Sequence, residues 1–412
     1  MSPEATDTLD LVVSGGRVVD PGTGVHEILD VGITGDRVVA LAPGGRLRGR
    51  ETLDATDCFV TPGLVDLHTH LFAGVSHYGV DADEYCLNRG VTTAVDAGSA
   101  GGQTFPGFTR YVVAGAATRV LAFLNISLIG MIVDTIGELE DLRYASVPDA
   151  VAVARNHPDL IVGIKVRLGE GRGTHDDPVP ALQRARQAAD ELGLPLMVHI
   201  SDMVIPVTDI VRFLGAGDIV THAFTAQRGS ILDPNGRICD GVVDARRRGV
   251  VFDVGHGRSS FSYRVARACL AQDFPPDTIS SDVHAHNVDG PVYDEVTTLS
   301  KLLHLGMSMP EAVDAATRQP ANAIGRGDVL GRLFVGGPAD ITILGVHGGP
   351  FDLPSGQGET ETVQEVLSAI WAIRAGVAHP CSHAPLRRGI GALCPDEDAL
   401  DYDGPGRHHR DR

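Results

Sequence analysis

The feature that most constrains the fold is an alternation of short apolar segments with longer, helix-compatible segments from about residue 58 to residue 282. The segments expected to be strands are Val60–His68, Thr92–Ala97, Val120–Ile126, Leu160–Val166, Leu196–Ile200, Ile219–Ala223, Val250–Val254 and Thr278–Asp282. Helices are expected at Asp149–Asn156, Ala181–Leu192, Gly241–Arg248 and Tyr263–Ala271. Continuous apolar strands that alternate with helices indicate a parallel sheet covered by helices.

Eight such units over about 250 residues predict an α/β fold of the (β/α)8 TIM-barrel type. A doubly wound open sheet is the alternative. That fold usually carries a glycine-rich turn after its first strand, and Gly63-Leu64-Val65 is not such a turn.

The two ends of the chain follow a different pattern, in which short β-like pieces such as Leu9–Val13 and Arg17–Asp20 are separated by turns. After expected helices at Asp294–Leu305 and Pro310–Arg318, this pattern returns at Val329–Val335 and Asp340–Leu344. The sequence therefore predicts that residues 1–58 and 328–384 form one small, discontinuous β-sandwich domain. Residues 59–327 would form the barrel, and residues 385–412, which include His408 and His409, would form a loose tail.

Composition narrows the class of partner. The chain has 412 residues with 53 acidic and 34 basic side chains, and its formal net charge of -19 argues against nucleic acid as a ligand. No apolar run approaches the ~20 residues that span a bilayer, and residues 1–10 show no apolar signal segment. The six cysteines are scattered and include no Cys-x-x-Cys pair, which favours reduced thiols in the cytoplasm.

Polar, metal-binding residue types occur at the ends of five of the expected strands. His68 and His70 are two residues apart, so in a strand their side chains share one face. Further candidates are Lys165 inside an apolar strand, His199, His222 and Asp282. Because the active site of such a barrel lies at the carboxyl ends of its strands, this set predicts a metal site.

The motif Pro62-Gly63-Leu64-Val65-Asp66-Leu67-His68-Thr69-His70 resembles the first-strand motif of the amidohydrolase superfamily. The later candidates match its remaining ligands in order. Within the superfamily, the segments at residues 90–101, 123–127, 163–165, 253–257 and 299–303 are similar to the amidohydrolase/deacetylase, or dihydroorotase-like, group. The chain departs from this group at residues 201–204 and 226–229, on two loops expected at the rim of the site.

The resemblance implies a centre with two divalent metal ions, expected to be zinc. One ion would be held by His68, His70 and Asp282, and the other by His199 and His222. Lys165, carboxylated by CO2 to a carbamate, would bridge them. An ammonium group at this position would repel two cations and would be costly to bury, so a lysine is plausible here only when neutralised. Asp282 would act as the catalytic proton carrier.

The implied activity is hydrolysis of an amide or ester bond in a small molecule. The first hypothesis is a deacetylase acting on an N-acetyl amino acid or an O-acetyl hydroxy acid. A cyclic amidase of dihydroorotase or hydantoinase type, an adenine-type deaminase and a non-catalytic scaffold are the alternatives. Barrels of this kind with a β-domain commonly self-associate, so a homo-oligomer is expected.

Four residues are candidates for substrate contact. Arg167 lies two residues beyond Lys165 and would clamp a carboxylate through two hydrogen bonds, although an ordinary ion pair is an equal alternative. His256 lies between two glycines, and Asn125 and Ser127 end the third expected strand. His284, His286 and His77 are expected at the rim, where rim structure or substrate contact is favoured over a second metal site.

Overall fold

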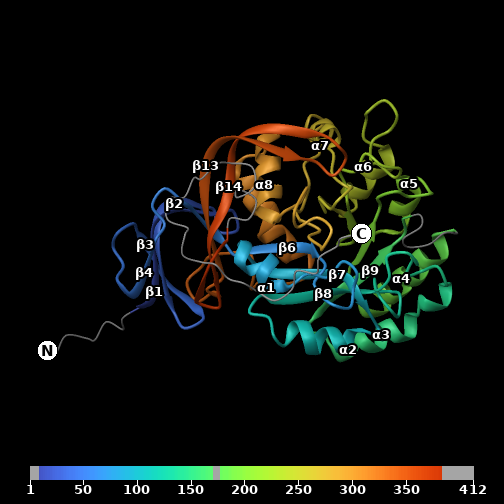
Figure 1. Ribbon diagram of the computed structural model, residues 1–412, viewed down its shortest axis with the longest axis horizontal. Coiled ribbons are helices and arrows are strands. Elements are labelled where there is room, and N and C mark those ends of the chain that lie inside the picture. The colour runs from blue at the N-terminus through green and yellow to red at the C-terminus, as the bar shows by residue number, and fades with distance from the viewer. Residues whose placement is uncertain (1–8, 170–176, 383–412) are drawn as a thin grey trace, which may run out of the picture.

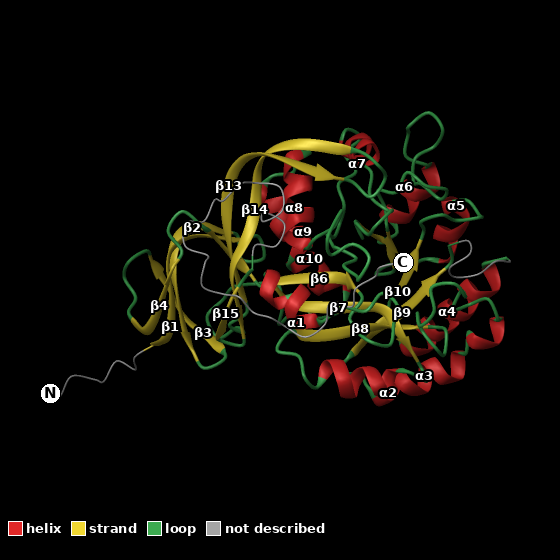
Figure 2. Ribbon diagram, viewed as in Figure 1, coloured by secondary structure: helices red, strands yellow, loops and turns green. Residues whose placement is uncertain are grey.

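The computed structural model describes residues 9–169 and 177–382 and contains two β-sheets. One is a seven-stranded sheet that is surrounded by helices, and the other is an eight-stranded sheet built from both ends of the chain (Figures 1 and 2). The predicted tail at residues 385–412 lies outside the described residues. None of the described helices is long and apolar enough to cross a membrane.

The seven-stranded sheet has the order β12-β11-β10-β9-β8-β7-β6, and every neighbouring pair is parallel. Its strands are β6 (Leu64–Thr69), β7 (Val91–Gly101), β8 (Arg119–Asn125), β9 (Ile161–Arg167), β10 (Leu196–His199), β11 (Ile219–Thr221) and β12 (Val251–Asp253). All residues of β6, β7 and β9 are buried, as continuous apolar strands require.

The eighth predicted strand, Thr278–Asp282, is not a regular strand. Its segment instead makes two isolated parallel bridges, Asp253 with Thr278 and Thr69 with Val283. Residues 278–283 therefore lie between β12 and β6 and link the two edges of the parallel sheet.

The helices are α1 (Ala82–Tyr85), α2 (Phe105–Phe108), α3 (Val147–Asn156), α4 (Val179–Leu192), α5 (Val207–Ile210), α6 (Asp240–Arg247), α7 (Tyr263–Leu270), α8 (Glu295–His304), α9 (Met309–Ala316) and α10 (Arg318–Ala323). Every helix predicted from the sequence is present, and the predicted helix Pro310–Arg318 is divided into α9 and α10. Local hydrogen bonds set several starting points: the side chain of Asp294 accepts from Thr297 N, and Ser308 and Glu311 form a capping box.

The second sheet has the order β15-β14-β13-β5-β1-β2-β3, with β4 paired to β1. Its strands are β1 (Leu9–Asp20), β2 (Val25–Thr34), β3 (Arg37–Pro43), β4 (Gly49–Asp54), β5 (Phe59–Pro62), β13 (Ile341–Pro354), β14 (Thr360–Arg374) and β15 (Val377–Pro380). Because β5 pairs with both β1 and β13, the two ends of the chain share one sheet. The strand pairing thus gives one continuous sheet and not the predicted sandwich of two.

Two further expectations about strands are wrong. The predicted strand Val60–His68 is two strands, because the chain leaves the mixed sheet at Gly63, whose N–H donates to Asp340 O, and then enters the parallel sheet as β6. The predicted strand Val329–Val335 is formed of turns, bends and irregular backbone.

The hairpin β13–β14 connects the two parts of the molecule. It begins in the mixed sheet, passes along α8, and ends beside α7, as the orange-red ribbon of Figure 1 shows. Along the way Leu367 N donates to Ser300 Oγ of α8 at 2.9 Å. The hairpin tip, residues 355–359, therefore reaches the same region as the loops that follow β11 and β12.

Candidate metal centre and active site

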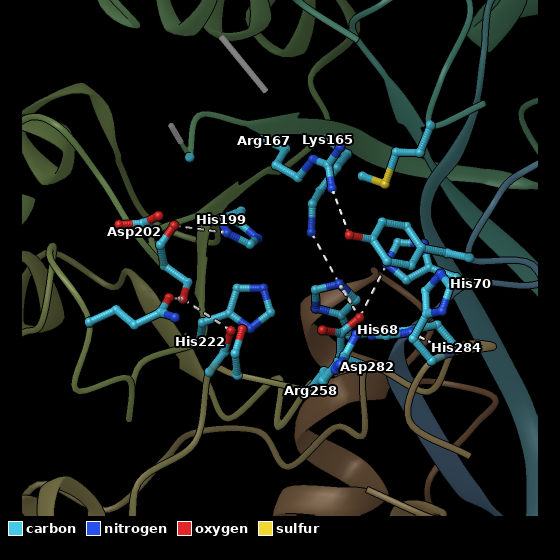
Figure 3. Close-up of a pocket in the computed structure, with 18 residues that line it drawn as sticks. His68, His70, Lys165, Arg167, His199, Asp202, His222, Arg258, Asp282 and His284 are labelled. Atoms are coloured by element: carbon cyan, nitrogen blue, oxygen red, sulfur yellow. Dashed lines mark hydrogen bonds and ion pairs between the residues drawn. The ribbon is translucent and has the colours of Figure 1, made fainter. Parts of the chain in front are cut away.

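A cavity of about 420 Å³ opens where the parallel strands end (Figure 3). All six predicted metal ligands line it: His68, His70, Lys165, His199, His222 and Asp282. His68 lies in β6, Lys165 in β9 and His199 at the end of β10. His70 and His222 directly follow β6 and β11, and Asp282 lies within the segment 278–283. The alignment of strand ends therefore brings the six side chains together.

The polar atoms of these side chains lie within a few ångströms of one another. Asp282 Oδ1 is 3.1 Å from His70 Nε2 and 3.4 Å from His68 Nε2. Lys165 Nζ is 3.3 Å from His68 Nε2. The rings of His199 and His222 have centroids 4.2 Å apart, and those of His68 and His222 are 5.1 Å apart.

Neighbouring groups fix which nitrogen of His68 faces the cavity. The Thr221 hydroxyl donates to Asp253 Oδ2 at 2.7 Å, so its oxygen is available to accept from His68 Nδ1, which is 2.8 Å away. Asp253 also accepts from the hydroxyls of Thr278 and Ser280, both at 2.7 Å. His68 Nδ1 therefore carries the proton, and the lone pair of Nε2 is directed into the site.

The same arrangement recurs at two other histidines. His222 Nδ1 donates to Gly255 O at 2.6 Å, which leaves the lone pair on Nε2. His199 Nε2 donates to Ser201 O at 3.1 Å, which leaves the lone pair on Nδ1. Backbone carbonyls have no proton to give, so these assignments follow from chemistry. Each ring thus has its unprotonated nitrogen available as a ligand.

Two further observations indicate that these residues fit a metal ion. His222 Nε2 and Asp282 Oδ1 are buried and make no hydrogen bond, which is costly unless another partner satisfies them. One ligand atom from each of His68, His222 and Asp282 lies within 4.8 Å of the others, so this group could hold an ion.

The electrostatics also favour metal ligation. Burial lowers the pKa of His70 to about 3 and of His222 to about 4, and it depresses the pKa values of His68 and His199 well below their ordinary value. The four rings are therefore neutral near pH 7, as ligands must be.

Burial lowers the pKa of Lys165 to about 8 and raises the pKa of Asp282 above its ordinary value. Both shifts arise because burial disfavours the charged form of each group. Gly98, in the left-handed region at φ +92°, lies against the lysine stem, and a Cβ there would be 2.8 Å from Lys165 Cγ. The stem is thereby held close to the β7 backbone.

Of the predicted substrate contacts, only Arg167 lines the cavity. Its Nε and Nη2 donate to the two carboxylate oxygens of Glu138 at 2.9 and 2.6 Å, and its Nη1 lies 3.3 Å from the Tyr78 hydroxyl. The paired edge of the guanidinium therefore holds a protein carboxylate, which is the ion-pair alternative that the sequence left open.

His256 lies behind the cavity wall, where its Nε2 accepts from Lys301 Nζ at 2.8 Å. Lys301, fully buried in α8, also donates to Pro291 O and Pro354 O. The Asn125 side chain donates to Gly98 O, and the Ser127 hydroxyl donates to Glu138 O. These three candidates bond to protein groups and do not line the cavity, so direct substrate contact does not follow from their positions.

Of the three histidines expected at the rim, two line the cavity and His77 does not. His284 and His286 line the cavity, and His284 Nδ1 accepts from His286 N at 3.1 Å. The His77 ring is tilted against the Tyr78 ring with centroids 3.8 Å apart, and His77 Nδ1 lies 3.5 Å from Asp134 Oδ1.

The sequence-based prediction missed three residues that shape the site: Asp253, Glu138 and Lys301. A signal existed for Asp253, because it is an acidic residue at the end of β12, as Asp282 is at the end of the predicted strand Thr278–Asp282. Glu138 and Lys301 lie in an irregular loop and on an outer helix, so nothing in the local sequence connects them to the cavity.

The family profile and the relatives found by comparison with known proteins agree. Residues 59–369 match the profile of the amidohydrolase family. A deacetylase of Agrobacterium fabrum is 33% identical over 84% of this chain and 85% of its own length. A deacetylase of Enterococcus faecalis is 32% identical over 89% of this chain and 98% of its own.

Solved structures agree in fold. The chain superposes with a TM-score of 0.83 on the crystal structure of an adenine deaminase, at 31% identity, covering 90% of this chain and 100% of the other. The crystal structure of a dihydroorotase gives the same TM-score at 30% identity, covering 90% and 99% of the two chains.

Proposed function

Because the chain belongs to the amidohydrolase family, whose members are of the TIM-barrel type and hydrolyse C–N bonds other than peptide bonds, we propose that it is a metal-dependent deacetylase. Its substrate would be a small acyl acid, such as an N-acetyl amino acid or an O-acetyl hydroxy acid. The observation that carries the proposal is the convergence of four neutral histidines, Lys165 and Asp282 in one cavity, in a chain that aligns with relatives named deacetylase over most of their length.

We assign two divalent metal ions to this cavity, with zinc as the expected element. His68, His70 and Asp282 would hold one ion, His199 and His222 would hold the other, and a carbamate on Lys165 would join them. When bound, such ions lower the pKa of water and polarise a carbonyl group.

The side chains of the protein would move the proton. Asp282 lies beside the predicted ligands, with Oδ1 in their midst. It would accept a proton from the attacking water and deliver it to the leaving nitrogen or oxygen, so that the products are a carboxylic acid and an amine or alcohol. The hydrogen bonds from His68 to Thr221 and from Thr221 to Asp253 would keep the imidazole ring of His68 in one tautomer during this step.

A cyclic amidase is the second candidate, because a dihydroorotase and an adenine deaminase are equally similar in structure. The deacetylase and the cyclic amidase would use the same six side chains. They differ in the molecule that the rim loops admit, and the rim is where this chain departs from the group, at residues 201–204 and 226–229.

A substrate screen tests the proposal. The protein, produced with zinc and bicarbonate, is incubated with N-acetyl amino acids, O-acetyl hydroxy acids, cyclic ureides and adenine. We expect release of acetate from the acyl acids, and no activity in the Asp282→Asn variant with any of them. Ring opening or ammonia release without acetate would replace the deacetylase by one of the alternatives, and metal analysis below one ion per chain would favour a non-catalytic scaffold.

The domain division is also kept as a proposal: a catalytic unit at residues 59–327 and a small unit at residues 1–58 and 328–384. The pairing of β5 with β1 and β13 argues for moving the first boundary to Pro62. The cytoplasmic location and the self-association expected from the sequence stay predictions.

A further inference from the structure

The tip of the β13–β14 hairpin is fastened to two loops of the cavity wall. Gln357 Nε2 donates to Ser259 O at 2.7 Å and to Thr225 Oγ1 at 3.2 Å, and its Oε1 accepts from Ala226 N at 3.1 Å. Ser259 lies in the loop after β12, whereas Thr225 and Ala226 lie in the loop after β11. One side chain of the hairpin therefore joins two neighbouring wall loops.

A second set of contacts fixes the same loop at its far end. The Glu359 carboxylate accepts from Tyr263 N at 2.8 Å and from the Ser262 hydroxyl at 3.1 Å, at the start of α7. Gly356 N donates to Phe261 O at 3.1 Å. A Cβ at Gly356 would be 2.9 Å from Arg258 O, so the hairpin lies directly on the backbone of Arg258.

The loop held in this way presents Arg258 to the cavity (Figure 3). Two arginines of the described residues line it, and their surroundings differ. Arg167 is buried and forms an ion pair with Glu138 through two hydrogen bonds. Arg258 is exposed to the cavity, and among the described residues no hydrogen bond or ion pair is made by its guanidinium group.

The acidic residues of the wall are already engaged. Asp202 pairs with Arg228 at 2.9 Å, and Asp282 lies among the predicted metal ligands. Among the described residues, Arg258 is thus a positive charge that no carboxylate pairs with, beside a site that would bind cations. A guanidinium group matches a carboxylate in shape and charge and binds it through two parallel hydrogen bonds.

We propose that Arg258 determines specificity by binding the carboxylate of an anionic acyl substrate, and that Gln357 is a positioning residue that holds Arg258 in place through Ser259. This inference rests on the proposed deacetylase function and assigns its carboxylate recognition to Arg258 instead of Arg167. The substrate class is an acylated amino or hydroxy acid with a free carboxylate.

The experiment compares two substrates that differ by one charge, N-acetylalanine and N-acetylalanine amide. KM and kcat are measured for the wild-type holoenzyme and for Arg258→Met. We expect KM for the acid to rise about 10- to 100-fold, as loss of charge-assisted hydrogen bonds requires, while KM for the amide changes less than about threefold. The control is Arg264→Met, which removes an exposed positive charge on α7 outside the cavity wall.

Gln357→Ala tests the positioning role. It should raise KM for the acid by about three- to tenfold with kcat nearly unchanged, whereas Thr362→Ala, on the same hairpin but bonded to Asp352, should change neither. For Arg258→Met, an equal change in KM for the acid and the amide, or no change in KM for either, would overturn the inference.

Calorimetric binding of the same two compounds separates the two proposals. Preferential binding of the acid that depends on Arg258, but without hydrolysis, would refute the deacetylase and leave the carboxylate site standing. Hydrolysis with a preference that does not depend on Arg258 would refute the carboxylate site alone. Failure of both compounds to bind would overturn the proposed carboxylate site as well.

Discussion

The pH at which the metal-free protein is reactivated should report the protonation of Lys165. Only a neutral amine reacts with CO2 to form a carbamate. Burial lowers the pKa of this lysine to about 8, from an ordinary value of 10.5. The neutral fraction is then about 1% at pH 6, about 9% at pH 7 and about 50% at pH 8, whereas an exposed lysine would be about 0.03% neutral at pH 7.

The initial rate of reactivation should therefore rise about 50-fold between pH 6 and pH 8 and level off above pH 9. The histidines contribute little to this change, because the pKa values of His70 and His222 lie at about 3 and about 4. Protonation of these two histidines is complete only far below the range of the experiment, so their titration does not set the midpoint.

The assay removes metal with a chelator and then adds zinc at each pH with dissolved CO2 held constant. Samples are withdrawn at short times, and their activity is measured at one common pH. Lys165→Ala is the control: it should not reactivate, and its zinc uptake should be independent of pH over the same range.

A flat profile for the wild-type protein would refute the role of a neutral Lys165. A rate that still rises tenfold per pH unit above pH 9 would refute the lowered pKa, because it would mean that the lysine titrates as if exposed.

Three substitutions test other parts of the structure. Asp253→Asn should weaken zinc binding about 10- to 100-fold in a chelator competition, because Asp253 orients the Thr221 hydroxyl below a ligand; unchanged affinity would contradict this. Gly257→Ala should lower kcat at least about tenfold, because φ is +56° and a Cβ would collide with Asp282 Oδ2. Gly236→Ala, where φ is also positive but no atom lies near the added Cβ, should leave kcat unchanged. Equal kcat values for the two variants would argue against the contact with Asp282. Phe123→Ala, which empties a fully buried site in β8, should lower the free energy of unfolding by about 3–5 kcal/mol in denaturant titration, and a loss below about 1 kcal/mol would show that the core refills.

The parallel sheet could be predicted because its strands are apolar throughout and end in residues that a barrel collects at one edge. The strand at Thr278–Asp282 is irregular for a reason that lies in its side chains. Ser280 Oγ bonds to Asp253, and Ser281 N and Oγ bond to Asp66. Side-chain acceptors on the neighbouring strands thus take up hydrogen bonds of this segment.

The convergence of the six side chains on one cavity could be predicted because each has a fixed place relative to its own strand. The substrate contacts could not be found in this way, because their partners are distant in sequence. Arg167 is engaged by Glu138, which lies 29 residues earlier in a loop, and His256 is engaged by Lys301, 45 residues later on a helix. The hydrophobic periodicity of these segments does not predict either pair.

The hairpin tip has a consequence for how the activity is encoded along the chain. All predicted metal ligands precede residue 283, whereas the tip that fastens the wall at Arg258 lies at residues 355–359. The metal ligands and Arg258 therefore lie in one stretch of sequence, whereas Gln357, which would hold Arg258 in place, lies in a later one. Exchange of Gln357 would therefore change how the acid is held while every metal ligand stays as it is.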